Sequence, residues 1–170
     1  MTYVNKIVAD LQDYARPLKP VAKETSLVDI IENLLLKNSV PKNIKASCQV
    51  EKDVEAIVTD ADLLKRVLGS LVTNAVQAMP QGGELSVQAC RDAGDVLVTV
   101  KDTGNGISKE VASKLFTPLF TTKSKGQGFG LAVVKRIAEM LGGTVTFESE
   151  VGKGTKFIMR LPSPKEINGK

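Results

Sequence analysis

Hydrophobic positions recur at two different spacings along this chain, and the change between them predicts where helices and strands lie. Near the start, Val4, Ile7, Leu11 and Tyr14 recur at gaps of three and four residues. This spacing predicts a helix over residues 3–16 with the apolar seam of a coiled coil or helical bundle. One such helix cannot bury its own seam, so we expect it either to form a homodimer with a second copy or to dock on its own domain.

The rest of the chain alternates between strand spacing and helix spacing. A linker is expected over residues 17–25, followed by a helix over 26–38 with Ser26 or the residue before it as the N-cap. Asp60 stands in the capping position of a long helix. Residues 116–128 show little periodicity and predict a mobile loop. The remaining helices are predicted over 61–79, 108–115 and 129–141, and the strands over 44–51, 55–59, 84–91, 96–101, 144–150 and 155–161.

This order of elements predicts an α+β domain. The expected architecture is a two-layer α/β sandwich in which helices cover one face of a mixed, mostly antiparallel sheet. Two predicted hairpins supply most of the antiparallel pairing, the second of them around Gly152 and Gly154. We expect residues 21–162 to form this domain, residues 1–20 to be the preceding helix and linker, and residues 163–170 to be a disordered tail.

Composition narrows the function classes. The 170 residues, 42% hydrophobic and 25% charged, fit one globular domain. No apolar run is long enough to span a bilayer, and the first residues do not form a signal peptide. We therefore expect a cytoplasmic protein with no membrane contact from this segment. The net charge of +4 comes from dispersed lysines, and two Tyr with no Trp argue against nucleic-acid binding.

Two residue types are informative because they are scarce. Cys48 and Cys90 lie far apart in predicted strands, so we interpret them as small buried hydrophobic residues rather than a disulfide. The chain contains no histidine. This excludes Ser-His-Asp and Cys-His catalysis and any imidazole metal site within these residues.

A polar residue interrupts the apolar face of the predicted helix over 61–79. Asn74 shares that face with Val67, Leu71 and Ala78. A carboxamide in an apolar stripe needs a partner, and its oxygen is a hard ligand of the kind that Mg²⁺ binds. Two interpretations stay open at this point: a hydrogen-bonded core asparagine, or a magnesium ligand.

Three glycine-bearing segments follow this helix. They are Asp102-Thr-Gly104-Asn-Gly106, Gly126-Gln-Gly128-Phe-Gly130 and Gly152-Lys-Gly154-Thr155. Taken alone, the first and the last are ordinary turns. The middle segment opens a predicted helix, where unpaired N–H groups favour an anion and glycines leave no Cβ to block a phosphate.

Together with Phe116-Thr-Pro-Leu-Phe120-Thr-Thr-Lys123, these segments resemble the ATP-binding core of the GHKL superfamily of histidine kinases, gyrase, Hsp90 and MutL. The resemblance covers roughly residues 26–161 and is closest to the catalytic domain of sensor histidine kinases. It implies the Bergerat fold, bound ATP and Mg²⁺, and a role in two-component signalling with a response regulator as partner. The helix over 3–16 resembles the second helix of the dimerisation domain of these kinases.

The resemblance implies a role for each segment. Asn74 would bind Mg²⁺, and Asp102 would accept a hydrogen bond from the amino group of adenine, where guanine has a carbonyl. Thr155 would support Asp102, and Lys123 would reach the terminal phosphates from a lid anchored by the two phenylalanines of its segment. The other implied nucleotide contacts are Ala78, Gly104, Gly106, Ile107, Gly126, Gly128, Gly130 and Leu131.

Two positions bear on the reaction. Hydrolysing members of the superfamily place a glutamate base one helical turn before the asparagine, whereas Ser70 stands here and is a poor general base. Many histidine kinases carry a basic residue where this chain has Gln77. We therefore expect phosphoryl transfer to a histidine on a separate dimerisation domain, with this chain a fragment of a longer kinase. The alternatives are a nucleotide-binding regulatory module without transfer chemistry and a GHKL-type ATPase.

Overall fold

The computed structural model describes residues 19–36, 40–118, 120 and 130–162. The elements found there, in chain order, are β1 (Lys23–Ser26), α2 (Leu27–Leu36), β2 (Ile44–Val50), the 3-10 helix η1 (Lys52–Val54), β3 (Ala56–Thr59), α3 (Ala61–Ala78), β4 (Gly83–Asp92), β5 (Asp95–Asp102), α4 (Lys109–Ala112), α5 (Gly130–Met140), β6 (Thr144–Glu150) and β7 (Gly154–Leu161). The predicted bundle helix over 3–16, most of the loop over 116–128 and the tail over 163–170 lie outside the described residues. Those three expectations, and self-association through the first helix, stay predictions.

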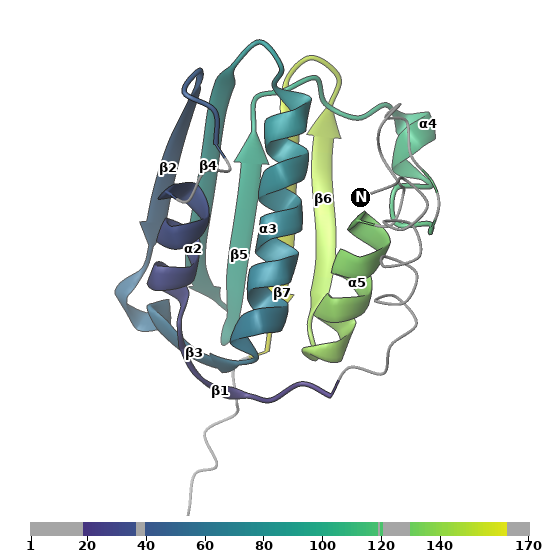
Figure 1. The fold of residues 1–170 in the computed structure, drawn as a ribbon. Helices are drawn as coiled ribbons and strands as arrows, with labels where there is room; N and C mark the ends of the chain where they lie inside the picture. Colours follow the sequence, from purple (N-terminus) through teal and green to yellow (C-terminus); the bar gives the residue numbers. More distant parts are fainter. Residues whose placement is uncertain (1–18, 37–39, 119, 121–129, 163–170) are drawn as a thin grey trace, which may run out of the picture.

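The strands of the described residues form one five-stranded sheet and one two-stranded sheet. The larger sheet has the order β2-β4-β5-β7-β6, with β2 and β4 parallel and every other neighbouring pair antiparallel. Helices α2, α3 and α5 cover one face of this sheet (Figure 1). The predicted two-layer sandwich with a mixed, mostly antiparallel sheet is therefore confirmed.

The apolar face of α3 packs on the centre of the sheet. Leu64, Leu68 and Leu71 follow helical spacing and are at most 1% exposed. They meet inward-facing residues of the middle strands, among them Val98 of β5 and Met159 of β7, which are fully buried. This packing fixes where the C-terminal half of α3 lies over β5, and the candidate site is built at that place.

The smaller sheet joins β1 to β3 and corrects one prediction. Residues 17–25 were expected to be a linker, but Lys23–Ser26 form a strand that pairs antiparallel with β3. The short stretch Lys-Glu-Thr-Ser has no alternation of apolar and polar residues that would predict a strand. Its strand conformation comes from pairing with a partner more than 30 residues away, since Lys23 pairs with Thr59. The predicted cap of the next helix is confirmed, because the Ser26 hydroxyl accepts a hydrogen bond of 3.2 Å from the Asp29 N–H.

Two further expectations differ from the structure. Helix α4 spans only Lys109–Ala112, shorter than the predicted 108–115, and Ser108 caps it by accepting from the Val111 N–H. Cys48 is exposed and Cys90 is half-buried, so the expectation of two buried thiols is wrong. The cause for Cys48 is the position of β2 at the edge of the sheet, where residues 45–49 are exposed on both faces.

Asp60 links the beginning of α3 to the chain that precedes β1. As predicted, it caps the helix: its Oδ1 accepts hydrogen bonds of 3.0 Å from the N–H groups of Asp62 and Leu63. Its Oδ2 accepts a third, of 2.8 Å, from the N–H of Val21. One carboxylate therefore holds two segments that are far apart in sequence.

We predict that Asp60→Ala lowers the free energy of unfolding by about 1–2 kcal/mol, because three backbone N–H groups lose their acceptor. Urea denaturation measures this difference. Asp62→Ala is the matched control, since its side chain is 92% exposed and its ion pair with Lys65 should contribute at most about 0.5 kcal/mol. Equal losses in the two variants would contradict the capping role.

The contribution of Asp60 should also depend on pH. Partial burial acts to raise the pKa of Asp60, but hydrogen bonds from the N–H groups of Leu63, Val21 and Asp62, with the charge of Lys23, outweigh it and hold this pKa below its ordinary value. A carboxyl with a lowered pKa stabilises the fold above its unfolded pKa of about 3.9 and loses that effect as pH falls through the folded pKa. The stability difference between wild type and Asp60→Ala should be constant near neutral pH and shrink below about pH 4.

Candidate functional site

The end of α3, the end of β5 and the β6–β7 turn lie together at one end of the molecule (Figure 1). The loop after β5 is bonded to the last turn of α3, because the Asn105 N–H donates to the Ala78 carbonyl oxygen at 3.1 Å. A Cβ on Gly104 would overlap that same carbonyl. Glycine is therefore required at this position for the close approach of the two backbones.

The same loop is bonded to the β6–β7 turn on its other side. The Gly152 N–H donates to the Asn105 carbonyl oxygen at 2.8 Å. Gly106 has a φ of +69° and a Cβ there would overlap the Glu150 carbonyl oxygen, while Gly154 has a φ of +105° and a Cβ there would overlap the Asp102 carbonyl oxygen. Three backbone segments thus meet with no room for side chains at their contacts.

Asp102 lies at the centre of this junction and is only 2% exposed. Its Oδ1 accepts hydrogen bonds from the Gly104 N–H at 2.8 Å and from the Thr155 N–H at 3.3 Å. Asp102 and Thr155 are direct cross-strand partners on β5 and β7, so their side chains share the helix-covered face. The backbone N–H of Thr155 therefore holds the Asp102 carboxylate, and the role in nucleotide binding that the resemblance gives to Thr155 stays a prediction.

Ser149 of β6 is a part of this site that the sequence interpretation missed. Its hydroxyl contacts the Ile107 N–H at 2.8 Å, the Gly154 carbonyl oxygen at 2.9 Å and the Thr155 hydroxyl at 2.8 Å. A signal was present: Ser149 is in phase with Val145 and Phe147, the inward-facing positions of a strand with alternating burial. A serine in that phase needs hydrogen-bond partners.

Asn74 is half-buried on α3, one helical turn before Ala78 and the junction. The start of α5 lies one further turn back along α3, because the Ser70 hydroxyl donates to the Gly130 carbonyl oxygen at 3.5 Å. Leu131 is partly buried against the core. The N-terminus of α5, with its partial positive charge, therefore faces the middle of α3 close to Asn74.

The predicted site residues thus fall into three groups. Ala78, Asp102, Gly104, Gly106, Ile107 and Thr155 meet at the junction, and Asn74, Gly130 and Leu131 lie beside it. Lys123, Gly126 and Gly128 lie outside the described residues. Phe116, proposed as a lid anchor or satellite core residue, packs its ring edge-to-face on Phe147, with centroids 5.9 Å apart.

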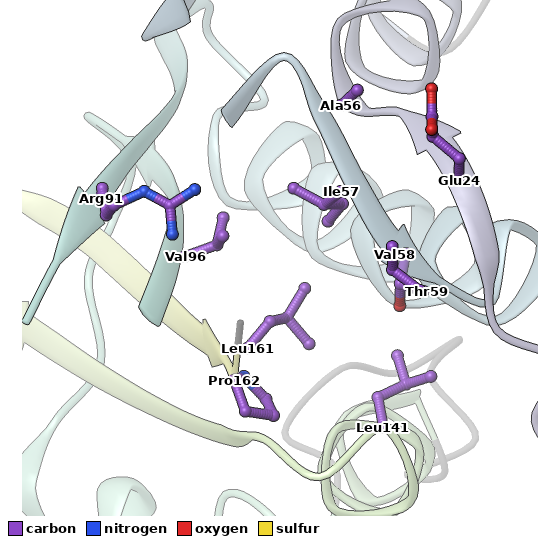
Figure 2. Close-up of a pocket in the computed structure, with 10 residues that line it drawn as sticks. All are labelled: Glu24, Ala56, Ile57, Val58, Thr59, Arg91, Val96, Leu141, Leu161 and Pro162. Carbon is purple, nitrogen blue, oxygen red and sulfur yellow. The ribbon is translucent and has the colours of Figure 1, made fainter. Parts of the chain in front are cut away.

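A separate cavity of about 310 Å³ lies at the other end of β5 (Figure 2). Ile57, Leu141, Leu161 and other apolar side chains line it, together with Glu24 and Arg91. The Arg91 guanidinium is already paired with Asp53 at 2.9 Å. Val96, which also lines the cavity, is six residues from Asp102 along the strand, or roughly 20 Å. The cavity is therefore distinct from the junction, and none of the predicted site residues that the structure describes lines it.

Comparison with solved structures defines the class of protein. The catalytic domain of the histidine kinase ThkA matches with a TM-score of 0.75 and 28% sequence identity, over 84% of this chain and 96% of that chain. Full-length ShkA in complex with AMPPNP matches with a TM-score of 0.83 over 95% of this chain and 36% of that one, at 22% identity, which shows the fold alone. The fold is that of histidine kinase catalytic domains.

The family is shown by sequence. Residues 59–165 match the model of the histidine kinase-, DNA gyrase B- and HSP90-like ATPases, and the chain belongs to this family. It is 36% identical over 163 residues to the sensor histidine kinase ZraS of Salmonella typhimurium, covering 94% of this chain and 35% of that protein. It is 32% identical to sporulation kinase D of Bacillus subtilis, covering 94% of this chain and 32% of that protein.

The chain therefore spans about a third of the length of the curated relatives it matches. No helix among the described residues is both long enough and apolar enough to cross a membrane.

We predict that Gly154→Ala destabilises the fold by about 2–5 kcal/mol, because the new Cβ adds a backbone overlap to the cost of a positive φ. Gly152→Ala is the matched control in the same turn: its φ is +79°, but a Cβ there meets nothing within 4 Å. It should cost only about 1–2 kcal/mol. Chemical denaturation of both variants makes the comparison, and equal losses would show that the close approach to Asp102 is unimportant.

Proposed function

We propose that this chain binds Mg-ATP at the junction around Asp102 and donates the γ-phosphate to a histidine on a separate dimerisation domain, as part of two-component signalling. The observation that carries the proposal is the buried Asp102 carboxylate, held by the N–H groups of Gly104 and Thr155 in a chain of the histidine kinase-, DNA gyrase B- and HSP90-like ATPase family. The acceptor histidine must come from elsewhere, since these 170 residues contain none.

The residues at the junction fit adenine. A buried carboxylate fixed in orientation by two backbone N–H groups is a strong acceptor for an exocyclic amino group. Gly104 and Gly106 bring the backbone close to α3 and to the β6–β7 turn, and Ala78 with Ile107 supplies apolar wall. The base would therefore lie against the ends of α3 and β5, with Thr155 beside Asp102.

The residues beside the junction fit the phosphates and the metal. Asn74 offers a carboxamide oxygen one turn from Ala78, and the N–H groups at the start of α5, around Gly130 and Leu131, favour an anion. Gly126, Gly128 and Lys123 would extend this phosphate contact. Bound Mg²⁺ would neutralise phosphate charge, and the protein would act mainly by positioning and by charge stabilisation.

The residue at position 70 favours phosphoryl transfer over ATP hydrolysis. The Ser70 hydroxyl lies 3.5 Å from the Gly130 carbonyl oxygen, at the contact between α3 and α5. A neutral serine at this position is a poor base for activating water. The nucleotide would therefore be held for an external acceptor, and a response regulator would receive the phosphate after the dimerisation domain.

We predict that Asp102→Asn weakens Mg-ATP binding about 10- to 100-fold, which corresponds to the loss of a hydrogen bond to a charged acceptor. Isothermal titration calorimetry of the 170-residue chain measures it. Asp95→Asn is the control, because Asp95 begins the same strand but pairs with Arg160 at 3.2 Å, far from the junction. If Asp102→Asn binds Mg-ATP with wild-type affinity, Asp102 does not contact the nucleotide.

We also predict phosphoryl transfer in trans. When the chain is mixed with Mg-ATP and a histidine-bearing dimerisation domain of the parent kinase, it should phosphorylate that domain. Incorporation of radioactive γ-phosphate into the dimerisation domain measures this transfer. Asn74→Ala should lower the rate about 100-fold or more through loss of the metal ligand. Thr73→Ala, which changes an exposed neighbour on α3, should leave the transfer rate unchanged.

Two other outcomes would favour the alternatives. ATP binding without any transfer would favour the regulatory module, and steady ATP hydrolysis that depends on Asn74 but survives Ser70→Ala would favour the ATPase.

A further inference from the structure

Three polar side chains lie in one row across the sheet at the candidate site. Asp102 of β5 pairs with Thr155 of β7, and Thr155 pairs with Ser149 of β6. Directly opposed residues on neighbouring strands have side chains on the same face. All three therefore point to the face that the helices cover, where a polar group must find a partner.

The Ser149 hydroxyl makes three contacts at hydrogen-bond distance. The Ile107 N–H lies 2.8 Å from its oxygen, the Gly154 carbonyl oxygen 2.9 Å, and the Thr155 Oγ1 2.8 Å. A hydroxyl has one proton to donate and two lone pairs with which to accept. Three contacts use this capacity completely.

Only one assignment of protons makes all three contacts hydrogen bonds. The Ile107 N–H can only donate, so Ser149 accepts from it. The Gly154 carbonyl can only accept, so the single proton of Ser149 goes there. The contact between Ser149 and Thr155 then has one solution: Thr155 donates its proton to the Ser149 oxygen.

This assignment determines what Thr155 can offer to a ligand. With its proton committed to Ser149, the Thr155 oxygen has only lone pairs left, so it is an acceptor. The neighbouring Asp102 carboxylate is an acceptor as well. A purine that lies against both residues meets a surface that accepts hydrogen bonds, which suits a 6-amino group and opposes a 6-oxo group.

We propose that Ser149 is a positioning residue that determines purine specificity, by holding the Thr155 hydroxyl as an acceptor beside Asp102. The proposal rests on the function proposed above and deepens it. The site takes a 6-aminopurine nucleotide in preference to a 6-oxopurine nucleotide, and part of this preference comes from a residue on β6 that acts through Thr155 without contacting the base.

The experiment compares two nucleotides and three proteins. Dissociation constants for Mg-ATP and Mg-ITP, which differ in the 6-amino and 6-oxo groups, are measured by calorimetry on wild type, Ser149→Ala and Ser149→Thr. In Ser149→Ala the Thr155 hydroxyl is free to rotate and donate to a 6-oxo group, so the preference for ATP over ITP should narrow about tenfold. Ser149→Thr keeps the hydroxyl and should keep the wild-type preference.

A purely structural role makes a different prediction. If Ser149 only anchors the loop at Ile107, Ser149→Ala will weaken both nucleotides equally and leave their ratio unchanged, and the proposal is overturned. If the proposal is correct, the gain in ITP affinity seen in Ser149→Ala will disappear when Thr155→Val is added. A wild-type chain that binds neither nucleotide would instead overturn the function proposed above, so the two failures are distinguishable.

A second variant keeps the test decisive if thermal melting shows that Ser149→Ala does not fold. Thr155→Val alone retains the shape of the side chain and removes the acceptor. It should weaken ATP binding about tenfold without weakening ITP binding, because the lost acceptor serves the 6-amino group and opposes the 6-oxo group. An equal effect on both nucleotides would overturn the assignment of Thr155 as an acceptor.

Discussion

The close contact of three backbone segments around Asp102 is the constraint on which the rest of this structure depends. The loop after β5 is bonded to the last turn of α3 through Ala78 and to the β6–β7 turn through Gly152. Glycine at 104, 106 and 154 makes these contacts possible, because a Cβ at each position would overlap a carbonyl of the facing segment. The result is a buried carboxylate with a fixed orientation at the point where a helix, a strand and a turn all end.

Much of the fold follows from local signals in the sequence. Asp60 and the apolar stripe through Leu64, Leu68 and Leu71 define α3 almost to the residue. The turn residues at Asp92 and Gly94 define the β4–β5 hairpin. By contrast, β1 could not be predicted, because it forms by pairing with β3, more than 30 residues away in sequence. The exposure of Cys48 follows from the edge position of β2, which no local pattern reveals.

In the candidate site, too, some residues could be predicted from local sequence and others only from the pairing of distant strands. Motif order was enough to bring Asp102 and Thr155 together, and their cross-strand pairing agrees with it. Ser149 was missed because its importance arises from register: it lies beside Thr155 only once β6 and β7 are paired. A serine in the inward phase of β6 was the available signal, but its three partners come from two other segments of the chain and cannot be read from spacing.

The two ends of the sheet have different chemistry. At one end, Asp102, Thr155 and the start of α5 offer acceptors and backbone N–H groups suited to a base and its phosphates. At the other end, the cavity beneath β1 and β3 is mainly apolar, and its guanidinium is already paired with a carboxylate (Figure 2). The cavity therefore does not lie where the polar groups converge, and the chemistry of the residues, more than the presence of a hollow, supports placing the candidate site at the other end.

The most direct test of the central claim is a crystal structure of the chain grown with Mg²⁺ and a non-hydrolysable ATP analogue. The account predicts the amino group of the adenine within hydrogen-bond distance of the Asp102 carboxylate, and the metal in contact with the Asn74 oxygen. Adenine bound elsewhere, for instance in the apolar cavity at the other end of β5, would contradict it.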